Sequence, residues 1–438
     1  MEIKQKQIEH TTDNRTVKAA LLGLGTVGSG VYQLVRERQE DFPSLCGTQI
    51  EISKILVRNP SKKREGIPSE LLTTDWEEIL HDPEISIIIE VMGGIEPAKS
   101  YLLAAMKAGK QIITANKDLI AEYGHELLDT AEANHCDLKF EAAVAGCVPI
   151  IQILKHSMVS EDITEIMGIV NGTTNYILTR MTQNGMTYEE ALQEATDLGY
   201  AEADPTADVD GLDAGRKIAI MASIAFHSRV TFSDVYIEGI RKISAKDIFY
   251  AKEFGSVIKL LGIARKDDRG IEVKVIPILI PEKHPLATVH DSFNAVFVHG
   301  TASDDTMYYG RGAGKLPTAS AVTGDLCSVA RHLMEHHSPL HVCSCYKDIP
   351  IKPIEDTSSR FFLRMQVADR PGVLANITSV FGTNNVSIAQ VVQKSRSDGM
   401  AELVIITDEV KELYFSDAMH ILENLSIVKT ISSLIRVY

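Results

Sequence analysis

Long apolar runs are missing from this sequence. A membrane-spanning helix needs about 20 consecutive apolar residues, and the longest runs here, such as Ile85 to Met92, are far shorter. The polar stretch at residues 1–15 also lacks the apolar core of a secretory signal, and we interpret it as a flexible tail. We therefore expect neither a membrane span nor a signal peptide.

Cysteine is scarce, and acidic residues outnumber basic ones. Six cysteines in 438 residues do not form the framework of a small disulfide-bonded domain, so we expect reduced thiols and a cytoplasmic protein. Because nucleic-acid binding relies on clustered Lys and Arg, a net charge of −15 argues against such a partner. The hydrophobic and charged fractions, 45% and 24%, are typical of globular proteins, and the length predicts two or three domains.

From Val17 to about Val144 the sequence alternates between strand and helix patterns. The expected strands are Val17–Leu22, Ile50–Val57, Ile85–Val91, Gln111–Thr114 and Leu138–Glu141, and the expected helices are Thr26–Arg36, Glu96–Ala108 and Leu119–Asn134. A run such as Ile85–Val91, which is nearly all β-branched, is typical of a strand covered on both faces. The alternation predicts an α/β fold with a doubly wound, Rossmann-type parallel sheet.

After Pro149 the pattern becomes mixed. The expected elements are a strand at Ile163–Val170, helices at Thr187–Leu198 and Asp210–Phe226, and an antiparallel hairpin within Val257–Ile280 around KDDRG. Together they predict a mixed α+β domain for substrate binding and oligomerisation. A further helix, at about 317–340, can return to the first domain.

The C-terminal region reads as a separate unit. KDIPIKPIEDTSS (347–359) contains two prolines and few large apolar residues, so we interpret it as a linker. Beyond it, residues 360–438 show strands and helices in the order βαββαβ, which is the ferredoxin-like arrangement. The expected domains are therefore 1–148, 149–346 and 360–438.

A glycine-rich turn follows the first expected strand and opens the first helix. It consists of Gly23, Leu24, Gly25, Thr26, Val27 and Gly28. The glycines of a GxGxxG motif permit a tight turn and let the backbone approach a dinucleotide pyrophosphate at the helix N-terminus. The second glycine-rich segment, GRGAGK (310–315), is not a P-loop, because Leu316 stands where Ser or Thr must bind magnesium.

The second strand bears on which dinucleotide binds. The NAD form of this fold places an acidic residue there for the ribose hydroxyls, but this strand ends in VRNPSKKR, with Arg58, Lys62 and Lys63. Cations at this place favour the 2′-phosphate of NADP. A solvated basic loop is the alternative, and NAD stays open.

The segment LGYAEADPTADVDGLDAGRKIA gathers carboxylates around a lysine. Asp213 and Lys217 are four residues apart, so on a helix they share a face. Gly199 and Glu202 open an acidic loop upstream that can reach this face. An ammonium beside carboxylates can hold a small zwitterion and move a proton on it. The alternative from spacing alone is a surface ion pair.

Another cluster is a weaker candidate. His332, His336, His337, His341, Cys343 and Cys345 fall within fourteen positions. The i,i+4 spacing of His332 and His336 is compatible with zinc, but histidines near a helix end also complement its dipole. The C-x-C spacing lacks the paired C-x-x-C arrangement typical of zinc sites, so we favour the interpretation without metal.

Several segments together resemble homoserine dehydrogenase. They are GLGTVG, TANKDLIA, EAAVAGCVPII, NGTTNYIL and LGYAEADPTADVDGLDAGRK. The resemblance covers about Val17 to His336 and implies NAD(P)-dependent interconversion of L-homoserine and L-aspartate 4-semialdehyde, in threonine, methionine and isoleucine biosynthesis. It also implies a homodimer or homotetramer.

The resemblance assigns roles to individual residues. Lys217 matches the family's general acid/base, and Asp213, Glu202 and Gly199 match its substrate site. Lys117 matches a second lysine between nicotinamide and substrate. Gly93 and Gly314 match cofactor contacts, and a monovalent-cation loop, for sodium, corresponds to Glu141, Val144, Gly146 and Val148.

The C-terminal unit resembles an ACT domain through DRPGVLANI and FGTNNVSI. The resemblance places an amino-acid effector, which we expect to be threonine, between two such domains. Its site would include Asp369, Gly372, Asn384 and Asn385. A dimerisation unit that binds no effector is the alternative.

Two rival functions are open at this point. One is an enzyme that oxidises the semialdehyde, which requires a nucleophilic cysteine with a nearby base; Cys147 is the sole cysteine close to a motif, and no histidine accompanies it in the sequence. The other is a non-catalytic amino-acid sensor on the same fold. The presence of both Lys117 and Lys217 argues against it.

Overall fold

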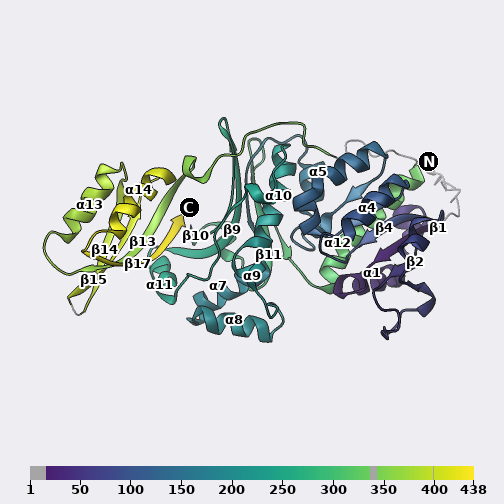
Figure 1. Ribbon diagram of the computed structural model, residues 1–438, viewed down its shortest axis with the longest axis horizontal. Helices are drawn as coiled ribbons and strands as arrows, with labels where there is room; N and C mark the ends of the chain where they lie inside the picture. Colours follow the sequence, from purple (N-terminus) through teal and green to yellow (C-terminus); the bar gives the residue numbers. More distant parts are fainter. Residues whose placement is uncertain (1–15, 336–342, 398) are drawn as a thin grey trace, which may run out of the picture. The chain divides into compact units, whose positions relative to one another are not determined.

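The computed structural model describes residues 16–335, 343–397 and 399–438, which divide into two compact units (Figure 1). Unit 1 contains the described residues up to 151 and from 313 to 344, and unit 2 contains 152–312 and the described residues from 345 to 438. The expected tail at 1–15, together with His336, His337 and His341, lies outside the described residues.

Unit 1 is built on a parallel sheet of six strands in the order β3-β2-β1-β4-β5-β6. The strands are β1 (Thr16–Leu22), β2 (Gln49–Leu56), β3 (Leu72–Thr73), β4 (Ile85–Glu90), β5 (Gln111–Thr114) and β6 (Leu138–Lys139). This is the Rossmann strand order, and it confirms the doubly wound α/β prediction.

Helices connect and cover these strands. They are α1 (Thr26–Glu37), α2 (Phe42–Cys46), α3 (Trp76–Leu80), α4 (Ala98–Lys107), α5 (Lys117–Ala133) and the late helix α12 (Lys315–Glu335). α12 shares a buried core with β1 and α1 through Val322, Leu326 and Val329. It packs closely on α1, because a Cβ on Gly30 would lie 2.7 Å from the Lys315 carbonyl oxygen.

Unit 2 is built on a sheet of eleven strands in the order β12-β11-β7-β9-β10-β17-β13-β15-β14, with β8 and β16 off this path. Its first part has β7 (Ile163–Ile169), β8 (Tyr236–Ile237), β9 (Ser256–Asp267), β10 (Gly270–Pro281), β11 (Phe293–Gly300) and β12 (Asp304–Arg311). The expected hairpin is β9–β10, paired along its whole length. The helices here are α7 (Gly172–Asn184), α8 (Tyr188–Asp197), α9 (Thr206–Val209), α10 (Leu212–Phe226) and α11 (Ala245–Glu253).

The C-terminal part of unit 2 has the expected βαββαβ order. Its elements are β13 (Ser358–Ala368), α13 (Val373–Thr383), β14 (Ile388–Ser397), β15 (Met400–Thr407), the short β16 (Val410–Lys411), α14 (Glu412–Glu423) and β17 (Val428–Val437). Its sheet continues the first one, because β17 pairs in parallel with β10 at Ile278↔Arg436 and Leu279↔Val437.

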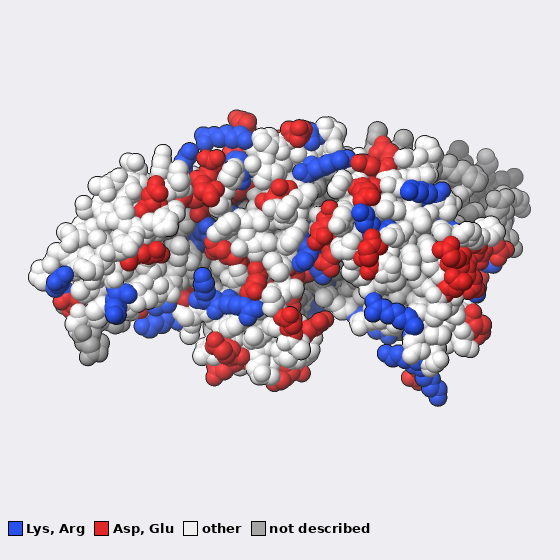
Figure 2. Space-filling view, viewed as in Figure 1, with Lys and Arg blue, Asp and Glu red and all other residues white. Residues whose placement is uncertain are grey.

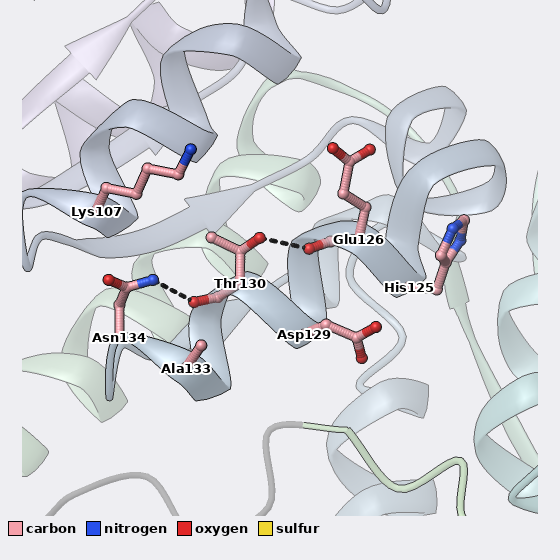
Figure 3. A pocket seen from close by; sticks show the side chains of 7 residues that line it. All are labelled: Lys107, His125, Glu126, Asp129, Thr130, Ala133 and Asn134. Atoms are coloured by element: carbon pink, nitrogen blue, oxygen red, sulfur yellow. Dashed lines mark hydrogen bonds between the residues drawn. The ribbon is translucent and has the colours of Figure 1, made fainter.

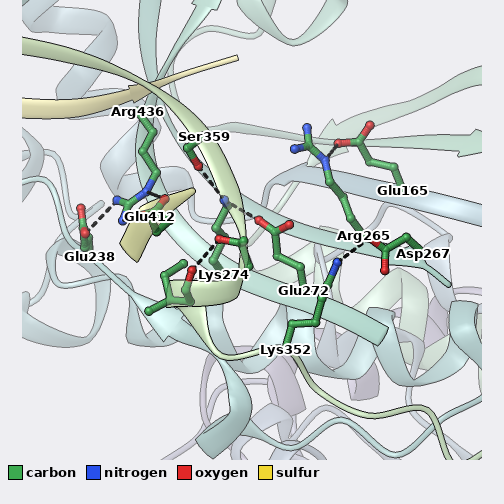
Figure 4. A network of polar contacts seen from close by, with 12 residues as sticks. Glu165, Glu238, Arg265, Asp267, Glu272, Lys274, Lys352, Ser359, Glu412 and Arg436 are labelled. Carbon is green, nitrogen blue, oxygen red and sulfur yellow. Dashed lines mark hydrogen bonds and ion pairs between the residues drawn. The ribbon is translucent and has the colours of Figure 1, made fainter. Parts of the chain in front are cut away.

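Ion pairs accompany this strand pairing (Figure 4). Arg436 donates to both carboxylate oxygens of Glu412, at 2.6 and 2.8 Å, and to Glu238 at 2.8 Å. Lys274 of β10 is buried and contacts Glu272 and the Ser359 hydroxyl. The C-terminal module is thus joined to the rest of unit 2 by a shared sheet with buried charge pairs beside it.

One expected helix begins two residues later than predicted. The sequence predicts a helix from Asp210, whereas α9 ends at Val209 and α10 begins at Leu212. Gly211 lies between them with a φ of +84°, a left-handed conformation that glycine adopts without steric cost. The break places Asp213 in the first turn of α10, where the helix dipole favours a carboxylate.

The described surface is mixed in charge. Lysine, arginine, aspartate and glutamate side chains alternate over the face shown in Figure 2. No helix of the described residues is long and apolar enough to cross a bilayer.

Candidate active site

The glycine-rich turn of unit 1 has the geometry of a dinucleotide site. Gly23 has a φ of +99°, and a Cβ on Gly28 would lie 2.3 Å from the Gly23 carbonyl oxygen. These two glycines are therefore required by the turn itself. Gly25 is different, because a Cβ there would meet no protein atom within 4 Å. It is the N-cap of α1 and has no side chain in front of the helix N-terminus, which leaves room for a phosphate.

Buried hydrogen bonds position Gly93 and Lys117 at the carboxyl ends of β4 and β5. The Glu90 carboxylate accepts from the Gly93 backbone N–H at 3.1 Å and from the Thr114 hydroxyl at 2.6 Å. Thr114 in turn accepts from the Asn116 backbone N–H, and the Asn116 side chain caps α5. Lys117 is the first residue of that helix. Ligands of α/β sheets bind at this edge.

The expected cation loop is a buried turn of unit 1. Ala145 and Gly146 have consecutive left-handed conformations, with φ of +53° and +58°, while Val144 and Val148 are buried. The Glu141 carboxylate accepts from the Ile151 backbone N–H at 2.9 Å. The Glu141 carboxylate is an oxygen ligand of the hard kind that a monovalent cation accepts, while the carbonyl oxygens of Glu141, Ala145 and Val148 accept backbone hydrogen bonds within the loop.

Two other expected cofactor residues are exposed. Arg58 follows β2 and is exposed, as are Lys62 and Lys63. Gly314 has a φ of +122°, and its carbonyl oxygen accepts from the Thr318 backbone N–H as α12 begins. These positions fit a cofactor site on unit 1, and Arg58 fits equally the alternative of a solvated loop.

The Lys217–Asp213 pair lies in unit 2 and is buried. The Lys217 Nζ donates to Asp213 Oδ2 at 2.7 Å and to the Val170 carbonyl oxygen at 2.7 Å. The two side chains are only 11% and 9% exposed. The surface ion pair that spacing alone left open is therefore wrong. A buried ion pair of this kind is costly unless it is fully hydrogen-bonded.

Two further polar residues complete this cluster, and the sequence reasoning missed both. Asn171 donates to Asp208 Oδ1 at 2.6 Å and to Asp213 Oδ2 at 2.9 Å. Burial raises the pKa of Asp208, and the charge of Asp213 adds to this, while the hydrogen bond from Asn171 and the charge of Lys217 oppose it. The NGTTN motif and the five-residue spacing of Asp208 and Asp213 were available as sequence signals. However, Asn171 is 37 positions from Asp208 and 42 positions from Asp213, so their contacts could not be read from local spacing.

The structure also connects the Gly199–Glu202 loop to this cluster. The Thr173 hydroxyl, in the first turn of α7, donates to the Tyr200 carbonyl oxygen at 2.7 Å. The rings of Tyr176 and Tyr200 lie 4.9 Å apart. Gly199 has a φ of +75°, and Glu202 is exposed. Unit 2 thus joins the loop that contains Gly199 to the start of α7, which Asn171 caps, and Glu202 is exposed.

The expected effector residues lie at opposite ends of one helix. Asp369 and Gly372 line a hollow of about 530 Å³ at the N-terminus of α13, together with Arg370 and Gln393. Asn384 and Asn385 follow the C-terminus of the same helix. Eleven helical residues separate the two ends by roughly 16 Å, so a single module of this chain does not bring the four residues together.

Two other candidate sites, the one at His332 and a groove along α5, show no catalytic or metal-binding arrangement among the described residues. His332 contacts the Asp137 carboxylate at 2.9 Å, and the described residues contain no group of three or more potential metal ligands. A groove of about 490 Å³ runs along α5 (Figure 3). Within it, the side chains of Thr130 and Asn134 donate to carbonyl oxygens of their own helix, so these donors are used in hydrogen bonds within α5 and at its end.

Comparison with known proteins gives one family. Residues 23–141 match the NAD-binding domain model of homoserine dehydrogenase, residues 149–327 match the homoserine dehydrogenase model, and residues 361–424 match the ACT domain model. The homoserine dehydrogenase of Bacillus subtilis is 44% identical and that of Corynebacterium glutamicum is 46% identical. The alignments cover 97% and 96% of this chain, and 98% and 95% of those proteins.

Solved structures give the same result. The crystal structure of a homoserine dehydrogenase from Thiobacillus denitrificans matches with a TM-score of 0.92 and 40% identity, over 97% of this chain and 98% of that one. That of the Staphylococcus aureus homoserine dehydrogenase matches with a TM-score of 0.78 and 38% identity, over 97% and 99%. The fold is thus shared along nearly the whole chain.

Proposed function

The chain belongs to the homoserine dehydrogenase family, oxidoreductases that act on a CH–OH group, and from this premise we propose that Lys217, held by Asp213, moves the proton of the reaction. The reaction interconverts L-homoserine and L-aspartate 4-semialdehyde. The buried contact of Lys217 Nζ with Asp213 Oδ2 and the Val170 carbonyl carries the proposal.

The chemistry needs a hydride and a proton at one carbonyl group. A bound nicotinamide cofactor supplies the hydride in the reducing direction and accepts it in the oxidising direction. Lys217 gives a proton to the semialdehyde oxygen as the new C–H bond forms, and it takes the proton of the homoserine hydroxyl in reverse. Because general acid–base catalysis requires a donor within hydrogen-bond reach, the anchored ammonium is suited to this role.

The neighbouring residues bind and orient the substrate. Asp213 and Glu202 would hold its polar groups, with Gly199 shaping the loop between them. Lys117, the first residue of α5, is the second lysine that we assign to the reaction. A buried carboxylate at Asp213 favours an ammonium-bearing substrate over an uncharged aldehyde.

The cofactor fits the glycine-rich turn, where Gly25 leaves the front of α1 open. Gly23, Leu24, Thr26, Val27, Gly28, Gly93, Lys117 and Gly314 are the other proposed contacts. We favour NADP because Arg58 follows β2, and a hyperthermophilic archaeal homoserine dehydrogenase, 26% identical, has been solved with NADPH. A chain that uses NADH as well as NADPH would instead point to the solvated-loop alternative.

The loop of Glu141, Val144, Gly146 and Val148 is the proposed site for a monovalent cation, sodium being our choice. Support comes from its buried left-handed turn and its oxygen ligands. A cation there would fix the chain between β6 and the start of unit 2, and this is the role that we give it.

We propose that the C-terminal ACT domain regulates the enzyme by binding an amino acid, threonine being our candidate. Asp369 and Gly372 line the hollow at α13, and Asn384 and Asn385 would come from a second module. β14 lies at one end of the described sheet and β12 at the other, and an outer strand is a natural pairing edge. This supports a homodimer or homotetramer.

The functional division that we propose follows the expected boundaries: 1–148 for the cofactor, 149–346 for catalysis and oligomerisation, with 317–340 returning to the first domain, a linker at 347–359, and 360–438 for regulation. Cys46, Cys136, Cys147 and Cys327 form no disulfide, which fits work in a reducing cytoplasm.

Absorbance at 340 nm tests the proposed function. Purified full-length protein with L-aspartate 4-semialdehyde should consume NADPH, and L-homoserine with NADP should produce it. A protein that binds threonine yet consumes no NADPH would instead be the sensor, which the family matches over both catalytic domains do not favour.

A further inference from the structure

Asn171 occupies a junction that the proposed mechanism has not used. It lies two residues after the end of β7, is 5% exposed, and caps α7 by accepting from the Thr174 backbone N–H at 2.9 Å. Its Oδ1 also accepts from the Thr174 hydroxyl at 2.9 Å. Its Nδ2 faces the other way and donates to Asp208 on α9 and Asp213 on α10. One amide therefore joins a strand end to three helices.

The atoms involved define the position of the Lys217 ammonium. Asp213 Oδ2 accepts from both Asn171 Nδ2, at 2.9 Å, and Lys217 Nζ, at 2.7 Å. Lys217 Nζ also donates to the carbonyl oxygen of Val170, the residue before Asn171. The dipeptide 170–171 thus holds both members of the pair, Lys217 through a carbonyl and Asp213 through an amide.

We propose that Asn171 is a positioning residue, whose amide fixes the Asp208 and Asp213 carboxylates so that the Lys217 ammonium directs its remaining N–H toward the substrate oxygen. An ammonium has three N–H groups, and the two contacts described account for two of them. The inference rests on the proposed role of Lys217 and deepens it.

Charge balance explains why a neutral donor is needed at this place. The charged groups that face the Asn171 amide are Asp208 on α9 and Asp213 and Lys217 on α10, so two carboxylates share one ammonium. An amide with two N–H groups can donate to both carboxylates without adding charge. Without it, Asp208 and Lys217 are free to approach one another, and the ammonium can turn away from the substrate. A displacement of about 1 Å can cost about 100-fold in rate.

Two substitutions separate positioning from helix capping. Asn171→Asp keeps the acceptor that caps α7, since Asp and Asn are equivalent N-caps, but it removes both donors. Asn171→Ser also keeps a capping oxygen, adds no charge and is too short to bridge the carboxylates. Thr187→Ala is the matched control, because Thr187 caps the neighbouring helix α8 in a capping box and has no part in the proposed chemistry.

The measurements are kcat and kcat/KM against pH, NADPH affinity by fluorescence, and thermal unfolding. We expect both Asn171 variants to lose about 30-fold or more in kcat while they bind NADPH as the wild type does. The hydrogen bond from Asn171 lowers the pKa of Asp208, so its loss should move the acid limb of kcat/KM to higher pH. Thr187→Ala should unfold at lower temperature and keep kcat within about twofold.

The outcomes are distinguishable. Suppose first that the wild type turns over, so that the proposed function stands. The positioning role is then wrong if Asn171→Ser keeps both its kcat and its acid limb. It is also wrong if Thr187→Ala loses as much kcat as Asn171→Ser. If the wild type does not turn over, the proposed function is wrong. The inference is then decided by NMR titration of the ¹³C-labelled Asp208 carboxyl, whose titration midpoint should be higher in Asn171→Ser than in the wild type, because the hydrogen bond from Asn171 lowers the pKa of Asp208. An unchanged midpoint would overturn it.

Discussion

Lys217 is held by oxygens from two different elements, the Asp213 carboxylate of its own helix and the Val170 carbonyl at the end of β7. Side-chain entropy usually makes a lysine a poor positioning group, because four rotatable bonds must be fixed. Here the Lys217 side chain is only 11% exposed and these two contacts hold it in place, so the ammonium is oriented before substrate arrives. Preorganised charge of this kind is a large source of rate enhancement.

Replacing Asp213 tests this account at the scale of one residue. Asp213→Asn keeps the shape but removes the charge that holds Lys217, and we expect kcat/KM to fall about 10²- to 10⁴-fold. Asp210→Asn is the matched control. Asp210 is three residues earlier and pairs with Arg241 at the surface, where an ion pair contributes about 0–1 kcal/mol. Equal losses in the two variants would contradict the role of Asp213.

The sequence predicted the residues of this pair but not their surroundings. Asp213 and Lys217 could be found because four positions on one helix are a local relation. Asn171 and Asp208 were missed, because they meet only when the end of β7, α9 and α10 come together. The burial of the Asp213–Lys217 pair could not be predicted for the same reason, because it depends on elements distant in the sequence.

At the scale of elements, the strands and helices with strong periodicity were predicted nearly to their ends. β4 and the β9–β10 hairpin are examples, since β-branched runs and a turn sequence are local signals. Contacts between elements were not predicted. The face of the C-terminal sheet covered by α11 shows this: there Arg364 donates to Asp247 at 3.0 Å and to Glu402 at 3.3 Å, all buried.

The glycine-rich turn gives a prediction for one element. Gly25→Ala should fold normally, because a Cβ there meets no protein atom within 4 Å, yet it should obstruct the pyrophosphate. We expect NADPH affinity to fall at least about tenfold, measured by fluorescence titration. The control is Gly324→Ala in α12, a position equally open and away from the turn. Unchanged affinity in Gly25→Ala would place the cofactor elsewhere.

Arg364 gives a second prediction, about stability. Arg364→Leu leaves the buried Asp247 carboxylate without its cation and Glu402 with Lys246 as its remaining cation, and we expect a loss of about 3–5 kcal/mol in the free energy of unfolding. Lys246→Ala removes a 59% exposed partner of the same Glu402 and should cost about 0–1 kcal/mol. Denaturant titration measures both. Similar losses of unfolding free energy in Arg364→Leu and Lys246→Ala would contradict the role of the Arg364 charge.

The same cluster predicts how stability depends on pH. Burial alone would raise the pKa of Glu402, but hydrogen bonds from Tyr250 and Lys246 and the charge of Arg364 lower it overall. A lowered folded-state pKa stabilises the protein fully above the ordinary carboxyl pKa, and this contribution is lost as pH falls through the folded-state value. Unfolding free energies from pH 7 to pH 3 should therefore fall less steeply in Glu402→Gln, and equal slopes would contradict this.

At the scale of the whole molecule, unit 2 joins the catalytic and ACT parts through one sheet. Because β17 pairs with β10 and Arg436 links Glu412 to Glu238, removing residues 355–438 would expose the edge of β10 and the buried Lys274. Truncation therefore tests folding more than regulation. Threonine titration of the full chain beside Asp369→Ala is the better test of the ACT proposal.

The central claim, that Lys217 moves the proton, is tested most directly by a single turnover. Lys217→Met and wild type, each in excess over L-aspartate 4-semialdehyde, are mixed with NADPH and followed at 340 nm by stopped flow. We expect unchanged NADPH affinity and NADPH consumption slowed by about 10³-fold or more in Lys217→Met. Consumption within about tenfold of the wild type would contradict it.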